Sequence, residues 1–308
     1  KHSMNIDGRE RNSQTDEAYL MLGKSRYYGQ RFLPALDAFN YILYKYPNSD
    51  KIYEAKIWRE KTNMRLGNDV LAIQNLSKLL KDFELKKQNL ANANAVLAES
   101  FLNIEEKDSA VAKLKIAEKF TKINSEKARY RFILGQLYEE LGKKDSALLN
   151  YESIIKMNRK ANREYWVQAY AKKAQLFDFQ NGDKAQMTKL FTTLVENREN
   201  RPFLDVIYHQ MGIFYDKNND QKAALKNYNL SLKKAKENPY LEASNFRNIG
   251  NMYFKNADFP LAAKYYDSTL VKLDSKTREF FFLFKTRKNL DDVIKYEGIS
   301  KKNDSILN

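Results

Sequence analysis

The sequence predicts an all-α protein, a right-handed superhelical solenoid in which helical hairpins repeat about every 38 residues. Only 10 Gly and 5 Pro occur among 308 residues, and Leu, Ala, Lys and Glu are abundant, a composition that favours helix over turns. A small residue is also followed 12 positions later by Ala and four further on by an aromatic ring. Four segments share this spacing: Gly23–Ala35–Phe39, Gly135–Ala147–Tyr151, Gly212–Ala224–Tyr228 and Gly250–Ala262–Tyr266.

The repeated spacing has a direct physical interpretation. Gly inside a helix costs about 1 kcal/mol relative to Ala, so it is expected where a neighbouring helix approaches too closely for a Cβ atom. The Ala of the second helix and the aromatic residue four positions later lie on one helix face. We therefore expect these positions to be buried between the two helices of each hairpin.

The Ala of the second helix recurs through the chain and defines seven repeats. It is expected at Ala35, Ala72, Ala110, Ala147, Ala185, Ala224 and Ala262. Ala98 supplies the small residue of the third repeat. Glu60 and Lys173 break the rule in the second and fifth repeats, and Ala174 would serve in the fifth if its loop were one residue shorter.

Short polar turns are expected between the paired helices, and proline after several second helices. Asp145, Asp220 and Asp258 are candidate N-caps for second helices. Proline follows second helices within 45–50 and 197–202, where it prevents the helix from continuing. Each repeat is therefore expected to be an antiparallel helical hairpin.

These features resemble the tetratricopeptide repeat, with its small residue, tyrosine, alanine, aromatic residue and following proline. The period exceeds the 34 residues of that family, and Arg26 stands where the first repeat should have Tyr. We expect an N-terminal arm over 1–15 and one solenoid over 16–308. Its expected repeats, the last a degenerate eighth hairpin, are about 16–49, 51–86, 88–123, 125–160, 163–200, 203–238, 240–274 and 276–306.

Residue types that carry catalysis or hold metals are scarce. The chain has no Cys, and its two histidines, His2 and His209, are far apart in the sequence. Phosphate-binding glycine loops and nucleophile motifs are absent. We therefore expect no enzymatic activity, no cofactor and no metal site.

Binding is the remaining class of function, and the first helices of such an array line its concave face. Offsets from three repeat glycines select nine candidate groove contacts: Phe132, Gln136, Glu139, His209, Ile213, Asp216, Arg247, Asn251 and Phe254. Arg247 and Asn251 resemble half of the carboxylate clamp with which some tetratricopeptide co-chaperones bind peptide C-termini. A soluble adaptor for acidic peptide tails is therefore an alternative function.

The net charge of +15 suggests an acidic protein, an anionic membrane surface or nucleic acid, or only a Lys-rich solvated surface. Basic runs occupy 113–131, 232–236 and 285–288, mostly on second helices and turns. Single-stranded nucleic-acid binding through these edges is a weaker alternative. The periodicity assigns nearly all aromatic residues to the hairpin core, so nucleic acid is not expected.

Residues 27–50, 54–80 and 107–120 resemble the SprE/PorW family, the tetratricopeptide-repeat lipoproteins of the type IX secretion and gliding machinery of Bacteroidota. The resemblance implies a non-enzymatic protein that links the outer-membrane translocon barrel to the periplasmic motor ring. It also implies an anchor at the periplasmic face of the outer membrane through a lipidated Cys. Because the chain does not begin with Met, we expect that Cys outside this sequence. Which surface meets which partner, and the oligomeric state, stay open.

Overall fold

The computed structural model describes residues 5–6, 9–10, 12, 14–235 and 238–307. Its described part is helical apart from one short antiparallel pair, β1 (Asn5–Ile6) and β2 (Arg9–Glu10), within the expected N-terminal arm. The all-α prediction is confirmed. Contacts between Cα atoms divide the chain into two compact units, Lys1–Asn162 and Arg163–Asn308. The single solenoid over 16–308 stays a prediction.

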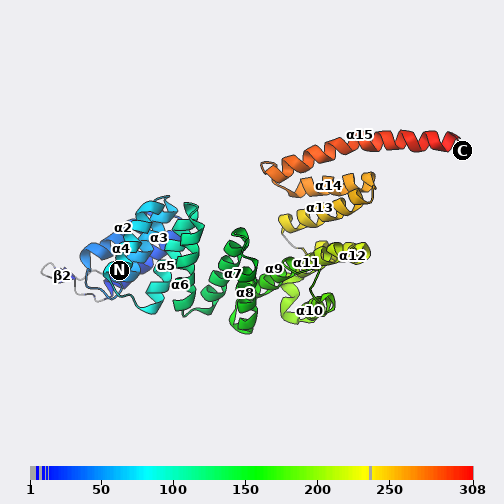
Figure 1. Cartoon of the computed structure of the whole chain (residues 1–308). Helices are drawn as coiled ribbons and strands as arrows, with labels where there is room; N and C mark the ends of the chain where they lie inside the picture. The colour runs from blue at the N-terminus through cyan, green and yellow to red at the C-terminus, as the bar shows by residue number, and fades with distance from the viewer. Residues whose placement is uncertain (1–4, 7–8, 11, 13, 236–237, 308) are drawn as a thin grey trace. The chain divides into compact units, whose positions relative to one another are not determined.

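The first unit consists of four helical hairpins, in the blue to green part of Figure 1. Its helices are α1 (Thr15–Tyr28), α2 (Phe32–Lys45), α3 (Ile52–Arg65), α4 (Asp69–Asp82), α5 (Lys87–Asn103), α6 (Lys107–Phe120), α7 (Asn124–Glu140) and α8 (Lys144–Met157), followed by the short η1 (Asn158–Lys160). The two helices of each hairpin pack together, and each second helix packs on the first helix of the next hairpin.

The second unit continues with helices that pack on their neighbours. They are α9 (Arg163–Gln175), α10 (Lys184–Glu196), the short η2 (Arg198–Phe203), α11 (Leu204–Lys217), α12 (Gln221–Lys234), α13 (Pro239–Lys255), α14 (Phe259–Lys272) and α15 (Arg278–Leu307). The predicted eighth hairpin is wrong: α15 is one helix of 30 residues that packs on α14 through Leu283 and Leu290. No Gly or Pro interrupts 278–297, so nothing there ends the helix.

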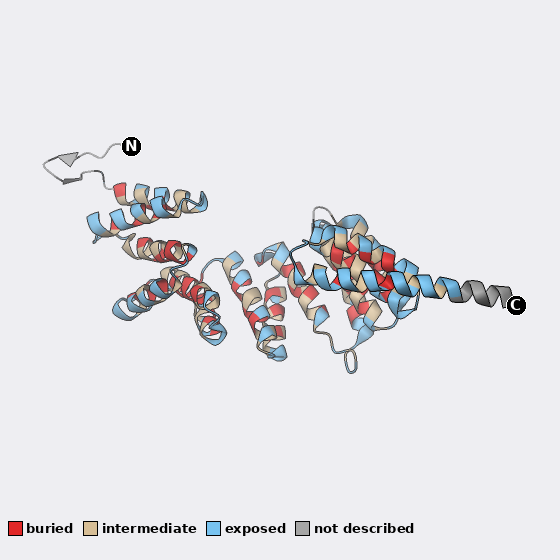
Figure 2. Cartoon of the chain, turned by 90° about the horizontal axis from the view of Figure 1, so that it is seen from above, coloured by how far each residue is buried: buried red, intermediate tan, exposed pale blue. Residues whose placement is uncertain are grey.

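The small residues of the repeat lie where the paired helices meet, and Figure 2 shows the buried faces of those helices. The second-helix residues Ala35, Ala110, Ala147, Ala224 and Ala262 are fully buried, and Ala98 is almost fully buried. Each repeat glycine lies against the aromatic ring of its own hairpin. A Cβ atom at Gly23, Gly135, Gly212 or Gly250 would lie 2.4–2.7 Å from the ring of Phe39, Tyr151, Tyr228 or Tyr266, respectively. The glycines therefore make room for a ring.

The fifth repeat departs from the predicted register. Ala185 is exposed, and the buried side chain near the start of α10 is Met187, with buried Phe191 four residues later. The loop before α10 is longer than we expected, not shorter, and Phe177 within it packs on Phe214 with ring centroids 5.5 Å apart. The longer loop shifts the repeat pattern by two residues.

In the second repeat a buried carboxylate replaces the small residue. Glu60 is 1% exposed. Its Oε1 accepts from Arg59 Nε at 2.6 Å, and its Oε2 accepts from Asn63 Nδ2 at 2.9 Å and Asn75 Nδ2 at 3.1 Å. A hydrogen-bonded cluster therefore joins α3 and α4.

Six of the tight turns inside hairpins place one residue in the left-handed region, which favours glycine. These residues are Gln30, Gly67, Glu105, Gly142, Asn219 and Ala257. The carboxylates of Asp220 and Asp258 then accept hydrogen bonds from the backbone N–H groups of Ala223 at 3.0 Å and Leu261 at 3.2 Å, as expected of N-caps. The N-cap prediction for Asp145 is wrong, because α8 begins one residue earlier, at Lys144.

Candidate functional site: two grooves lined by first helices

The larger groove lies in the first unit, has a volume of about 550 Å³ and is lined mainly by first helices α1, α3, α5 and α7. We call it the N-terminal groove. The residues that define its chemistry are Tyr27, Tyr28, Trp58, Lys61, Arg65, Glu99 and Arg129. First helices can expose these side chains because the second helices bury their other faces.

One wall of the N-terminal groove is aromatic. The rings of Tyr27 and Tyr28 meet the Trp58 ring edge to face, with centroids 5.4 and 5.8 Å apart. Trp58 also stacks on the buried Phe39 ring at 6.3 Å, which holds the wall on the hairpin core. Tyr28 is 71% exposed, so a large ring is available to a ligand at little conformational cost.

Lys24 and Lys61 lie over rings of this wall, and Arg65 and Arg129 line the same groove. The Lys61 ammonium lies 4.6 Å from the Trp58 ring centroid and 5.3 Å from that of Tyr27. Burial lowers the pKa of Lys61, with the Glu99 carboxylate opposing the effect and the Arg129 guanidinium adding to it. In the described structure neither Arg65 nor Arg129 forms an ion pair, and both side chains are exposed.

The acidic residues of the groove are mostly engaged in the fold. Glu54 accepts from Lys24 Nζ at 2.6 Å. Glu126 Oε2 accepts from the Thr121 hydroxyl at 2.7 Å and from Gln88 Nε2 at 3.0 Å. Among the described residues, Glu99 has no partner within hydrogen-bond or ion-pair distance. Among the described residues, three cations and one carboxylate of the groove therefore have no ion-pair partner: Lys61, Arg65, Arg129 and Glu99.

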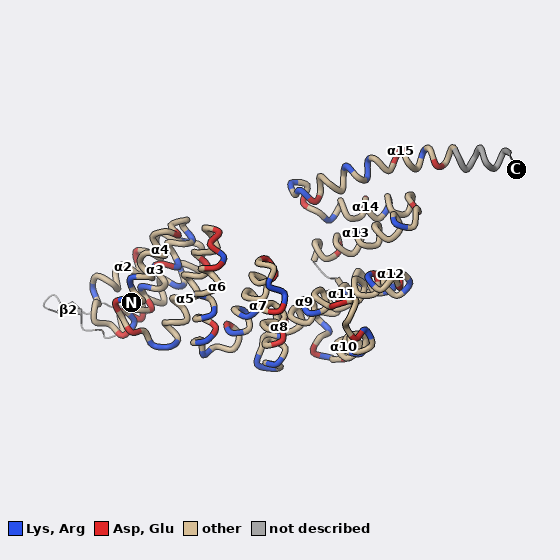
Figure 3. The backbone as a smooth tube through the Cα atoms, in the orientation of Figure 1, with Lys and Arg blue, Asp and Glu red and all other residues tan. Residues whose placement is uncertain are grey.

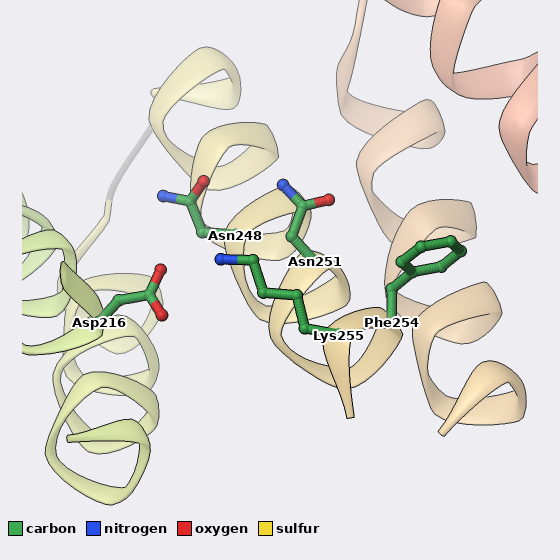
Figure 4. A pocket seen from close by; sticks show the side chains of 5 residues that line it. All are labelled: Asp216, Asn248, Asn251, Phe254 and Lys255. Atoms are coloured by element: carbon green, nitrogen blue, oxygen red, sulfur yellow. The ribbon is translucent and has the colours of Figure 1, made fainter. Parts of the chain in front are cut away.

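The smaller groove lies in the second unit and has a volume of about 370 Å³. Figure 4 shows Asp216 of α11 facing Asn248 and Lys255 of α13 across it, with Asn251 and Phe254 also on α13. Asn251 Oδ1 accepts from the Tyr266 hydroxyl at 2.9 Å, so its orientation is fixed by the hairpin core. Three of the nine predicted groove residues line this pocket.

Four other predicted groove residues lie on α7 and α11. Gln136 is exposed. Phe132 packs on Tyr151 with ring centroids 5.7 Å apart, and Glu139 accepts a hydrogen bond from the Tyr151 hydroxyl. Ile213 packs on the hydrophobic cluster around Tyr228. Apart from Gln136, these side chains contribute to packing within or between hairpins.

His209 is not a groove contact, because it is only 6% exposed. Its Nδ1 lies 2.8 Å from Asn245 Oδ1, and Asn245 Nδ2 donates to Ser231 Oγ at 2.8 Å. The amide oxygen is an acceptor, so Nδ1 donates. The Ser231 hydroxyl in turn donates to the Asp205 carbonyl at 2.7 Å. Burial lowers the pKa of His209, so the ring joins α11 to α13 as a neutral donor.

The predicted half-clamp is not free for a ligand. Arg247 forms an ion pair with Glu279 of α15, and its Nη2 lies 3.4 Å from Ser244 Oγ. A peptide carboxylate would have to displace Glu279. The physical reason is that α15 packs against α14 and brings Glu279 within reach of α13. The sequence contained no pattern that paired these two residues.

Sequence reasoning missed the N-terminal groove, although the same offsets would have found part of it. The nine predicted contacts came from positions three before, one after and four after the repeat glycine. Applied at Gly23, Glu60 and Ala98, those offsets also reach Tyr27, Lys61 and Glu99, which all line the groove. The prediction used only Gly135, Gly212 and Gly250, so it left out the first repeat, which has Gly23, and the second and third repeats, which lack the glycine.

No group of three His, Cys, Asp or Glu side chains in the described residues is arranged to hold a metal ion. Within the same residues, no helix combines the length and the apolar character that crossing a bilayer requires. Lys and Arg are spread over most helices of both units and interspersed with Asp and Glu (Figure 3). Some of the basic residues are engaged locally, as Arg131 is with Glu118 at 2.8 Å.

Comparison with known proteins indicates the same class of fold. A family profile described as "Tetratricopeptide repeat" matches residues 17–49. A tetratricopeptide repeat protein from Parabacteroides merdae is similar in structure, with a TM-score of 0.59, 15% identity, and coverage of 90% of this chain and 100% of that chain. The C-terminal part of a TPR repeat-containing protein from Cytophaga hutchinsonii has a TM-score of 0.56, 13% identity, and coverage of 86% and 98%. No curated protein matches.

The fold is thus that of a tetratricopeptide-repeat array. Proteins of this class are typically without catalytic activity. The two grooves are lined by aromatic, amide and charged side chains from first helices, a composition suited to contact with polypeptide.

Proposed function

We propose that this chain is a protein-binding scaffold of the type IX secretion machinery, where it links the outer-membrane translocon to the periplasmic motor ring and supports secretion and gliding motility. The observation that carries the scaffold role is the N-terminal groove, with its aromatic wall and unpaired cations. The secretion role is supported by the resemblance of 27–50, 54–80 and 107–120 to the SprE/PorW family. The same resemblance supports anchoring at the periplasmic face of the outer membrane through a lipidated Cys outside this chain.

Co-purification from native membranes tests the secretion role. The full protein, tagged at its own locus, should recover translocon and ring subunits, as identified by mass spectrometry. An Arg65→Gln/Arg129→Gln variant should lose a subset of those subunits. A Lys78→Gln/Lys115→Gln variant removes the same charge from exposed positions on α4 and α6 and should keep them all. Recovery of no translocon or ring subunit by the unaltered protein would overturn the assignment to type IX secretion.

The anchor has a test of its own. The full protein should incorporate a labelled fatty acid and fractionate with the outer membrane, and replacement of the acylated Cys should release it to the periplasmic fraction. Fractionation with the cytoplasm would overturn the proposed location while leaving the scaffold role untouched.

A further inference from the structure

The unpaired charges of the N-terminal groove indicate what it binds. Lys61 and Arg65 come from α3, and Arg129 comes from α7, with α5 lying between these helices in the chain. Glu54 and Glu126 are engaged by Lys24, Thr121 and Gln88, which leaves Glu99 as the unpaired carboxylate. An occupant with negative charge would supply these cations with the carboxylate partner that they lack among the described residues, beside the ring contacts that Lys61 already makes.

The aromatic wall adds a second requirement. Tyr28 is 71% exposed, and Trp58 is positioned beside it by its contact with Phe39. Burial of rings held in this way is most favourable when another aromatic or a large apolar side chain packs on them. Lys61 lies over the Trp58 ring, and Arg65 and Arg129 line the same groove, so acidic and apolar groups of an occupant have to be neighbours.

We propose that the N-terminal groove binds an extended, internal segment of a partner protein in which acidic side chains flank an aromatic or large apolar side chain. This inference rests on the proposed scaffold function but not on the secretion system. Cations distributed over two non-neighbouring first helices suit several carboxylates along an extended chain better than a single terminal carboxylate. The Glu99 carboxylate, which also lines the groove, makes a phosphate backbone a poorer occupant than a peptide.

Fluorescence anisotropy with labelled peptides tests the proposal on the intact chain. The probe is a short peptide, acetylated and amidated at its ends, with Phe flanked by Glu on both sides. Two matched probes replace Glu by Gln or Phe by Ser. The first probe should bind at least about tenfold more tightly than either matched probe, because charge-assisted contacts and ring burial act together.

Variants of the protein should change the affinity for the acidic probe in opposite directions. Arg65→Gln/Arg129→Gln should weaken binding of the acidic probe about tenfold, whereas Glu99→Gln should tighten it about two- to fivefold by removing repulsion. The Lys78→Gln/Lys115→Gln control should leave affinity unchanged. Tyr28→Ala, at an exposed ring, should weaken binding without affecting the fold, which circular dichroism checks.

Several outcomes would overturn the inference. Two concern the acidic probe: equal affinity for the Glu and Gln probes, or weaker binding of the Glu probe by the Glu99→Gln variant than by the unaltered protein. Two concern other ligands: tenfold tighter binding of an uncapped peptide with a free C-terminal carboxylate than of the capped probe, or tighter binding of a single-stranded oligonucleotide than of the acidic probe. Failure of the co-purification with preserved peptide binding would remove the secretion role alone. The two hypotheses are therefore separable.

Discussion

Gly135 on α7 and Tyr151 on α8 fit together so closely that a Cβ atom at Gly135 would lie 2.5 Å from Tyr151 Cε1. The Tyr151 side chain is fully buried, and its hydroxyl donates to Glu139 one turn after the glycine. The same close contact between a glycine and an aromatic ring recurs at Gly23, Gly212 and Gly250. The glycine of this repeat therefore leaves the space that an aromatic ring of the partner helix occupies.

The first prediction is that the effect of Gly135→Ala changes sign with the partner residue. In the unaltered chain we expect destabilisation of about 1–2 kcal/mol, because overcrowding outweighs the gain in helix propensity. In a Tyr151→Leu background the same change should be neutral or stabilising, because the ring is gone. Urea unfolding of the four proteins of this double-mutant cycle measures the coupling.

A control for this cycle is Gly298→Ala in α15, where a Cβ atom would meet no neighbour within 4 Å. It should stabilise the chain by up to about 1 kcal/mol through helix propensity alone. If Gly135→Ala is as stabilising as this control, the packing interpretation is wrong.

Much of the fold could be predicted from the sequence because the glycine, alanine and aromatic residue repeat at fixed spacing. The prediction failed where local chemistry differs. Ala185 fitted the period, but the loop containing Phe177 is longer and Met187 is buried instead. The eighth hairpin failed because it continued the repeat into a segment that lacks the repeat's small residues, and 278–297 contain no Gly or Pro that ends a helix.

The second prediction concerns the left-handed residue in the turns. Ala257 has φ 58° and is exposed, so its Cβ is strained without compensating contacts. Ala257→Gly should stabilise the second unit by about 1 kcal/mol, because glycine removes that strain. Gly142→Ala in the first unit, at φ 71°, is the reciprocal change and should destabilise by a similar amount. Thermal unfolding followed by circular dichroism measures both.

The third prediction concerns the buried carboxylate of the second repeat. Glu60→Gln replaces one acceptor oxygen by an NH₂ group, which then faces either the Arg59 donor at the Oε1 position or the Asn63 and Asn75 donors at the Oε2 position. We expect a loss of about 1–3 kcal/mol in the free energy of unfolding, the cost of leaving buried donors without acceptors. Glu54→Gln, at a half-buried carboxylate paired with Lys24, should cost less than about 1 kcal/mol. Equal losses at the two positions would contradict the network.

The groove was less predictable than the fold, for a physical reason. Periodicity identifies which helix face is turned away from the hairpin core, but not whether a polar side chain there is already engaged. Arg247 lies on α13 as expected, yet it already forms an ion pair with Glu279 of α15. His209 fitted the same offset, yet Asn245 of α13 covers it. Such pairings join residues 32 and 36 positions apart, and a spacing rule within one repeat cannot reach them.

The last prediction is a pH dependence carried by His209. Burial lowers its pKa below the ordinary value of 6.5, with the Asn245 hydrogen bond and the Asp205 carboxylate opposing this and the Arg247 guanidinium adding to it. Above pH 6.5 the ring is neutral in both states, so it contributes no pH dependence. At pH values between 6.5 and the lowered native pKa, His209 binds a proton in the unfolded chain but not in the native chain. Stability should therefore fall as the pH decreases through this window, and the loss should level off below the native pKa.

A His209→Gln variant keeps an N–H donor for Asn245 but does not titrate, so its stability curve should be flatter between about pH 5 and 8. The comparison must account for Asp205, whose pKa is raised by burial and whose native carboxylate therefore takes up a proton before the unfolded one. That effect has the opposite sign, stabilising the fold as the pH falls, and it acts closer to the ordinary carboxyl value of 3.8. Urea unfolding of both proteins across the pH range measures the difference. Parallel curves would show that His209 titrates normally in the native state, and would exclude the buried neutral donor that joins α11 to α13.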